Sequence, residues 1–191
     1  MSAPPRPGAE PMRAFVALDL PEDVLDALEA LQPGLPVGRA TGRDTMHLTL
    51  AFAGEHPQER IEELHDELSR LCAPPFGLQL KGLGSFGGDT PSILFAGVEA
   101  GEALEGLARQ VRSALRRAGL PVPRDRFRPH VTLARFRPRM GPSELELLNR
   151  FVAERAGFRA GPFPVTSFAL YESLLHPEGA RHRELARYPL G

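Results

Sequence analysis

Two short segments of the sequence share one arrangement of a histidine and a threonine. They read His47-Leu48-Thr49-Leu50-Ala51 and His130-Val131-Thr132-Leu133-Ala134, with the two histidines 83 residues apart. An imidazole gains or loses a proton near neutral pH, and a hydroxyl can donate a hydrogen bond to an oxyanion. One such triplet would carry little weight, because threonine is common in strands and most single histidines are structural. Its repetition indicates a paired acid and base.

Both segments have the alternation of a β-strand with one buried face. Successive side chains of a strand point to opposite faces, so His130 and Thr132 share one face while Val131 and Leu133 take the other. His47 and Thr49 are related in the same way. We therefore expect each half of the chain to supply one such strand, with both imidazoles facing a shared central cleft.

The composition is that of a soluble globular protein. The chain has 191 residues, 42% of them hydrophobic and 25% charged, and its net charge of −1 gives no overall basic bias for coating nucleic acid. No apolar run approaches the roughly 20 residues of a membrane span. The single cysteine, Cys72, excludes an intramolecular disulfide and fits a reducing compartment, and we expect it in the core. We expect a monomeric, cytoplasmic protein without membrane contact.

The chain divides into a short tail and one domain. Residues 1–12 include four prolines and no apolar core, which predicts a disordered tail. Residues 13–191 predict a single domain with two pseudo-symmetric lobes, roughly 13–100 and 101–191, which could be intertwined. Periodicity predicts strands over 13–20, 46–52, 76–80, 92–99, 126–136, 164–173 and 183–190, and helices over 21–31, 57–72, 101–118 and 141–157. The predicted class is α+β, each lobe a small, mainly antiparallel sheet with outer helices.

The twin motifs resemble the signatures of the 2H phosphoesterases. Within that superfamily the chain resembles the RNA 2′,3′-cyclic phosphodiesterases, also called the 2′-5′ RNA ligase family, over residues 13–190. Further matching segments are 13–21, 82–86, 127–135 and 168–173. The chain departs from the family in having no Trp before the first motif, Ala53 where the family usually has Leu, and His182 where a Tyr is common three residues before a Leu.

The resemblance implies hydrolysis of RNA 2′,3′-cyclic phosphate ends to 2′-phosphomonoesters, without cofactor or metal, and 2′-5′ ligation as the same step in reverse. It implies that His47 is the proton donor and His130 the proton acceptor. Thr49, Thr132 and Arg135 would bind phosphate, although strand parity directs Arg135 away from His130 unless a bulge or the end of the strand re-aims it. Phe52, the equivalent position in the first half, is a candidate for stacking on a base and equally a candidate core aromatic.

Local charge weakly favours the same division of roles. Arginines surround His130 against one acid, Asp125, and nearby positive charge favours a neutral imidazole. These arginines are Arg124, Arg126, Arg128, Arg135, Arg137 and Arg139. The segment after His47 is rich in acids (Glu55, Glu59, Glu62, Glu63), which would favour imidazolium if they lay close to it.

Two other functions remain open from the sequence. One is a phosphodiesterase acting on another cyclic or 2′-linked nucleotide. The other is a non-catalytic module that binds RNA or nucleotides, although intact histidines and threonines in both motifs argue against it. A metal site is not expected, because neither Cys-x-x-Cys nor His-x-x-x-His occurs in the sequence.

Overall fold

The computed structural model describes residues 11–99, 101–122, 126–176 and 179–191. The predicted tail lies outside the described residues up to residue 10, and its last residue, Met12, already begins a strand. The described strands are β1 (Met12–Leu18), β2 (Arg39–Ala40), β3 (Leu48–His56), β4 (Phe76–Phe86), β5 (Ile93–Val98), β6 (His130–Arg135), β7 (Arg159–Val165), β8 (Ser167–His176) and β9 (Gly179–Pro189). The helices are α1 (Glu22–Glu29), α2 (Gln58–Ser69), α3 (Glu102–Arg117) and α4 (Pro142–Glu154), with short 3₁₀ turns η1 (Gln32–Gly34) and η2 (Arg43–Thr45).

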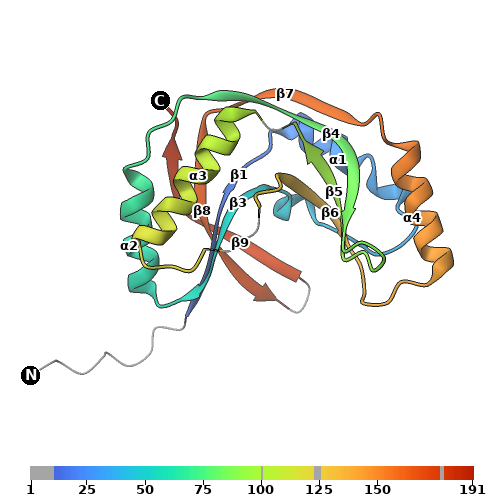
Figure 1. Cartoon of the computed structure of the whole chain (residues 1–191), viewed down its shortest axis with the longest axis horizontal. Helices are drawn as coiled ribbons and strands as arrows, with labels where there is room; N and C mark the ends of the chain where they lie inside the picture. The colour runs from blue at the N-terminus through green and yellow to red at the C-terminus, as the bar shows by residue number, and fades with distance from the viewer. Residues whose placement is uncertain (1–10, 100, 123–125, 177–178) are drawn as a thin grey trace, which may run out of the picture.

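The strands form one curled antiparallel sheet in the order β7-β4-β5-β6-β3-β1-β8-β9, with β2 also paired to β6 (Figure 1). Two groups of four strands meet in the middle of this order, where β3 and β6 pair through Leu48 and Val131. The predicted α+β class with antiparallel pairing and outer helices is confirmed. The two predicted small sheets are joined into one through that central pair.

Each group of four strands combines both halves of the chain. Strands β4 and β5 come from the first half but lie beside β6 and β7, while β8 and β9 from the second half lie beside β1. A division of the sequence near residue 100 therefore does not coincide with the division of the sheet. In the group β7-β4-β5-β6, every strand pairs with at least one strand from the other half of the chain.

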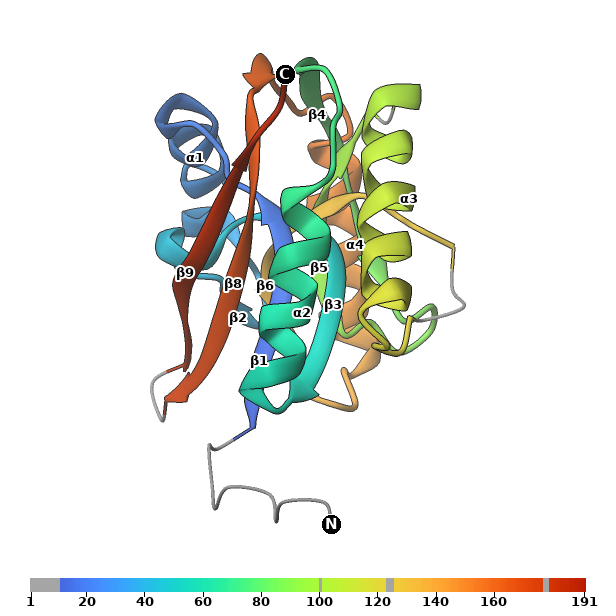
Figure 2. The same ribbon diagram turned by 90° about the vertical axis from the view of Figure 1, so that its left-hand side faces the viewer.

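Amphipathic helices cover the outer faces of the sheet. Helices α2 and α3 contact each other and pack on β1 and β3 (Figure 2). Their buried stripes follow the predicted spacing, with Ile61, Leu64 and Leu68 on α2 and Leu104, Leu107, Val111 and Leu115 on α3. Helix α3 ends one residue before the predicted residue 118, and Gly119 follows its C-cap, Ala118, with a φ of 71° that favours glycine. Among the described residues, no helix is long and apolar enough to cross a membrane.

Several predictions about local structure were wrong. Strand β4 runs to Phe86 rather than ending at residue 80, and β6 begins at His130 rather than at residue 126. The segment 164–173 was predicted as one strand, but β7 ends at Val165 and β8 begins at Ser167. The break lets β7 pair with β4 and β8 pair with β1, at opposite ends of the sheet order. Cys72 is exposed rather than in the core, and its Sγ lies 3.2 Å from the Gly191 carbonyl oxygen.

Candidate active site

The two motifs present their histidines and threonines on one face of the sheet, called here the histidine face. Leu48 and Val131 are fully buried and pair directly across β3 and β6. Directly opposed residues of paired strands point to the same side of a sheet. Their neighbours His47, Thr49, His130 and Thr132 must then point to the other side, and all four are half-buried.

A β-bulge follows each motif. Opposite β5, Phe95 pairs with Thr132 and Leu94 with Ala134, so Leu133 is an extra residue in β6. Opposite β1, Ala17 pairs with Thr49 and Val16 with Ala51, so Leu50 is extra in β3. A bulge shifts the alternation by one position.

The bulges bring Arg135 and Phe52 onto the histidine face. Leu133 and Ala134 are consecutive buried residues, and the next side chain, Arg135, is exposed. In the first motif Leu50 and Ala51 are buried and Phe52 is 56% exposed, so Phe52 is not a core aromatic. Strand parity alone would have directed Arg135 away from His130, and the bulge corrects this. The same holds for Phe52 and His47.

His47 lies just before β3 in a largely apolar environment. Its ring stacks on Phe15 with centroids 4.7 Å apart, and the ring of His182 meets it edge-on at 5.0 Å. Burial and the charge of His182 lower the pKa of His47 to about 4, against a hydrogen bond with the Thr45 backbone and the attraction of Asp19, which both raise it. The unliganded protein therefore holds His47 neutral near pH 7.

His130 is held in a defined tautomer. Its Nδ1–H donates to the Arg128 carbonyl oxygen at 2.7 Å, which leaves Nε2 as the proton acceptor. The edges of Phe86 and Phe95 approach the ring, with centroids at 4.9 and 5.6 Å. Burial lowers the pKa of His130, and the charge of Arg135 lowers it further, against the Arg128 hydrogen bond that raises it. Both motif histidines therefore form a hydrogen bond with the backbone of the residue two positions earlier, Thr45 for His47 and Arg128 for His130.

The aromatic support behind the two histidines is also duplicated. Phe15 of β1 lies against His47 and stacks on Tyr171 of β8, with centroids 5.4 Å apart. Phe95 of β5 lies against His130 and stacks on Phe86 of β4 at 4.3 Å. Each imidazole is therefore supported by aromatic rings from the next two strands of the sheet, which are β1 and β8 for His47 and β5 and β4 for His130.

An acid anchors the first of these stacks. The Tyr171 hydroxyl donates to Asp19, which also binds Arg187 at 2.6 Å. Burial and the Asp19 hydrogen bond raise the pKa of Tyr171, so its hydroxyl stays protonated. Asp19 is thereby fixed near His47.

His182 is part of the site although the sequence did not place it among the site residues. It lies on β9, opposite Ser173, and its ring is 4.7 Å from Phe15 as well as 5.0 Å from His47. Burial and the charge of Arg135 lower its pKa. The signal in the sequence was its occurrence at a position where relatives commonly have Tyr. No local pattern could show that the β8–β9 hairpin returns to β1.

The charge argument from the sequence is correct for one histidine and wrong for the other. Arg135 does act on His130 and favours its neutral form. The acids after His47 do not hold an imidazolium there, because none is among the groups that influence its pKa, which falls rather than rises. Glu59, Glu62 and Glu63 lie exposed on α2, outside the sheet. Arg124 and Asp125 lie outside the described residues.

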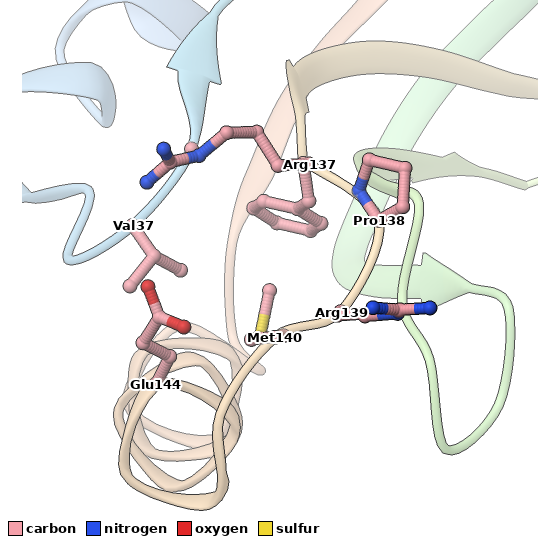
Figure 3. A pocket seen from close by; sticks show the side chains of 8 residues that line it. Val37, Arg137, Pro138, Arg139, Met140 and Glu144 are labelled. Atoms are coloured by element: carbon pink, nitrogen blue, oxygen red, sulfur yellow. The ribbon is translucent and has the colours of Figure 1, made fainter.

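A separate cavity of about 310 Å³ lies between the loop after β6 and the start of α4 (Figure 3). Phe136, Met140 and Val37 line it together with Glu144, whose carboxylate accepts the Gly141 N–H at 2.8 Å. None of the predicted site residues lines this cavity. In the described part of the chain, no three His, Cys, Asp or Glu side chains converge as a metal site would require.

Comparison with known proteins points to one family. The model of the 2′-5′ RNA ligase superfamily matches residues 19–176. The RNA 2′,3′-cyclic phosphodiesterase of Thermus thermophilus is 35% identical over 194 residues, which cover 94% of this chain and 90% of that protein. The RNA 2′,3′-cyclic phosphodiesterase of Archaeoglobus fulgidus is 27% identical over 178 residues, 91% of this chain and 98% of that protein. The apo crystal structure of LigT from E. coli superposes with a TM-score of 0.77 at 29% identity, covering 95% of this chain and 99% of that one.

Proposed function

The chain belongs to the 2′-5′ RNA ligase superfamily, and we propose that it is an RNA 2′,3′-cyclic phosphodiesterase that opens the cyclic phosphate to a 2′-phosphomonoester. The observation that carries this proposal is the pair of His-x-Thr motifs meeting on one face of the sheet through Leu48 and Val131. The substrates are RNA ends or nucleotides with a 2′,3′-cyclic phosphate.

The reaction is an in-line displacement at phosphorus. Nε2 of His130 takes a proton from water as the water oxygen attacks phosphorus. The bond from phosphorus to the ribose 3′ oxygen breaks on the opposite side, and His47 gives its proton to that oxygen. Each proton transfer is worth roughly 10²–10⁴ in rate. The cycle ends with His47 neutral and His130 protonated, and proton exchange with water restores both.

Neutral side chains and one cation hold the phosphate. The hydroxyls of Thr49 and Thr132 donate to its non-bridging oxygens, where negative charge must be stabilised. Arg135 contributes a charge-assisted hydrogen bond from the histidine face. Phe52 offers an exposed ring on the His47 side, where the nucleoside must lie because it carries the leaving oxygen.

Binding of the substrate allows His47 to act as an acid. With a pKa of about 4, His47 is mostly neutral in the unliganded protein near pH 7. A bound phosphate anion stabilises the imidazolium and raises that pKa. The proton donor therefore forms fully only with substrate in place, while Arg135 keeps His130 in its base form. The assignment of donor and acceptor rests on the family resemblance.

The test is incubation of the purified protein with a 2′,3′-cyclic nucleotide and identification of the product by ³¹P NMR. We expect a 2′-phosphate. A 3′-phosphate would reverse the assigned regiochemistry and keep a two-histidine hydrolase. Binding without turnover would support the non-catalytic module instead. Turnover of other cyclic or 2′-linked nucleotides at a higher kcat/KM would assign a different substrate to the same chemistry.

A further inference from the structure

His182 is an ionisable group of the histidine face that the hydrolytic mechanism does not use. Its ring contacts the rings of His47 and Phe15, at 5.0 and 4.7 Å, in edge-on geometry at 72° and 70°. A residue needed only for packing in that place could be any aromatic. An imidazole differs from the other rings in carrying a titratable proton.

We propose that His182 is a third phosphate-contacting residue, which takes up a proton when a phosphomonoester dianion occupies the site and forms an ion pair with it. The inference rests on the proposed function, because it concerns the product of that reaction. It concerns product binding rather than bond cleavage.

The charge balance of the site supports this. Four side chains there can be positive, namely His47, His130, His182 and Arg135. Burial lowers the pKa values of all three histidines, and an anion in the site would raise them again. The cyclic diester brings one negative charge, whereas the monoester ionises a second time with a pKa near 6. A third histidine that can gain a proton therefore matches the doubly charged product better than the singly charged substrate.

The carboxylates of β8 and β9, and Asp19, already have cationic partners. Glu172 of β8 binds Arg183 at 2.6 Å, and Asp19 binds Arg187 at 2.6 Å. Glu184, on β9 itself, also binds Arg187. Turn η2, which contacts β9, carries Arg43 and Asp44, and Arg43 binds Asp26 of α1 at 2.9 Å. Other ionisable neighbours are Arg135, whose charge acts on His182, Tyr171, whose hydroxyl is protonated, and Arg181 on β9.

The proton step is balanced within the site. The monoester leaves bond cleavage as a monoanion with one P–O–H group. That proton moves to the free ring nitrogen of His182, which gives a phosphate dianion and an imidazolium. No bond to phosphorus forms or breaks in this step. Release of the product then returns the proton to water, so product affinity falls as the pH rises.

Calorimetric titration with adenosine 2′-monophosphate tests the inference. The titration is run at about pH 7.5, where the free monoester is already a dianion, in two buffers of different ionisation enthalpy. The wild-type protein, His182→Gln and His182→Tyr are compared, with His176→Gln as the matched control at an exposed histidine of β8. The variant His182→Tyr keeps a ring against Phe15 and His47, which separates packing from charge.

We expect both His182 variants to take up fewer protons on binding than the wild type, by up to about one per ligand, and to bind about tenfold more weakly. The control should match the wild type. Proton uptake that is unchanged in both variants would overturn the inference, whatever the affinity. Failure of the wild type to hydrolyse 2′,3′-cyclic nucleotides, with the proton linkage intact for this ligand, would overturn the proposed function and leave the inference standing.

Discussion

Leu48 and Val131, the middle residues of the two His-x-Thr motifs, are direct antiparallel partners at the junction of the two strand groups. The two motif histidines and the two motif threonines flank this pair and point to the opposite face of the sheet. This buried pair therefore holds the proposed proton donor, proton acceptor and phosphate-binding threonines on one face of the sheet.

The first prediction concerns that pair. Leu48→Ala removes a fully buried side chain at the junction, and we expect the free energy of unfolding to fall by about 2–5 kcal/mol. Urea denaturation followed by circular dichroism measures it. Leu175→Ala is the control, since that side chain is 76% exposed, and it should change the free energy by less than about 0.5 kcal/mol. Equal losses in the two variants would show that the junction adds nothing to stability.

The second prediction concerns pH. The sequence alone suggests activity around neutrality, but burial lowers the pKa of both motif histidines, that of His47 to about 4. The active free enzyme needs His47 protonated and His130 neutral, so the bell-shaped profile of kcat/KM should have its maximum below pH about 6.5. Above it, the rate should fall as His47 loses its proton. The kcat profile should lie at higher pH, because bound phosphate raises the pKa of His47. Coincident profiles would contradict a substrate-charged acid.

The third prediction concerns Arg135. Arg135→Ala removes the proposed phosphate ligand and a positive charge that lowers the pKa of His130. We expect affinity for a 2′-phosphate product to fall about tenfold and the pKa of His130 to rise toward its ordinary value. Calorimetry and histidine NMR titration measure the two effects. The control is Arg150→Ala, on an exposed position of α4. Unchanged product affinity would mean that the bulge does not bring Arg135 to the phosphate.

The fourth prediction concerns metals. The proposed mechanism uses only protein side chains, so turnover of a 2′,3′-cyclic nucleotide should survive dialysis against excess EDTA. The measurement is the initial rate before and after dialysis, then after adding back zinc or magnesium. A rate lost with EDTA and restored by either ion would replace this mechanism with a metal-assisted one.

The sequence predicted the elements of this fold better than their arrangement. Alternation and helical spacing depend on local residues, so the motif strands and the stripes of α2 and α3 could be recognised. The bulges at Leu50 and Leu133 could not, because an extra residue shows only against a partner strand. They decide whether Phe52 and Arg135 reach the histidine face. The same holds for His182, which the β8–β9 hairpin brings to His47 from 135 positions further along the chain.

The last prediction concerns the two motif histidines together. His47→Ala and His130→Ala should each reduce kcat/KM for a 2′,3′-cyclic nucleotide by about 10²–10⁴, since each removes one proton transfer. The double variant should be hardly worse than either single one, because donor and acceptor act in one displacement and their losses do not add. Thr49→Ala and Thr132→Ala should cost less, since water can partly replace a hydrogen bond to phosphate. Steady-state kinetics gives these values, with folding verified by circular dichroism. Additive losses in the double variant would indicate two independent steps, and near-normal turnover in either single variant would remove the two-histidine mechanism.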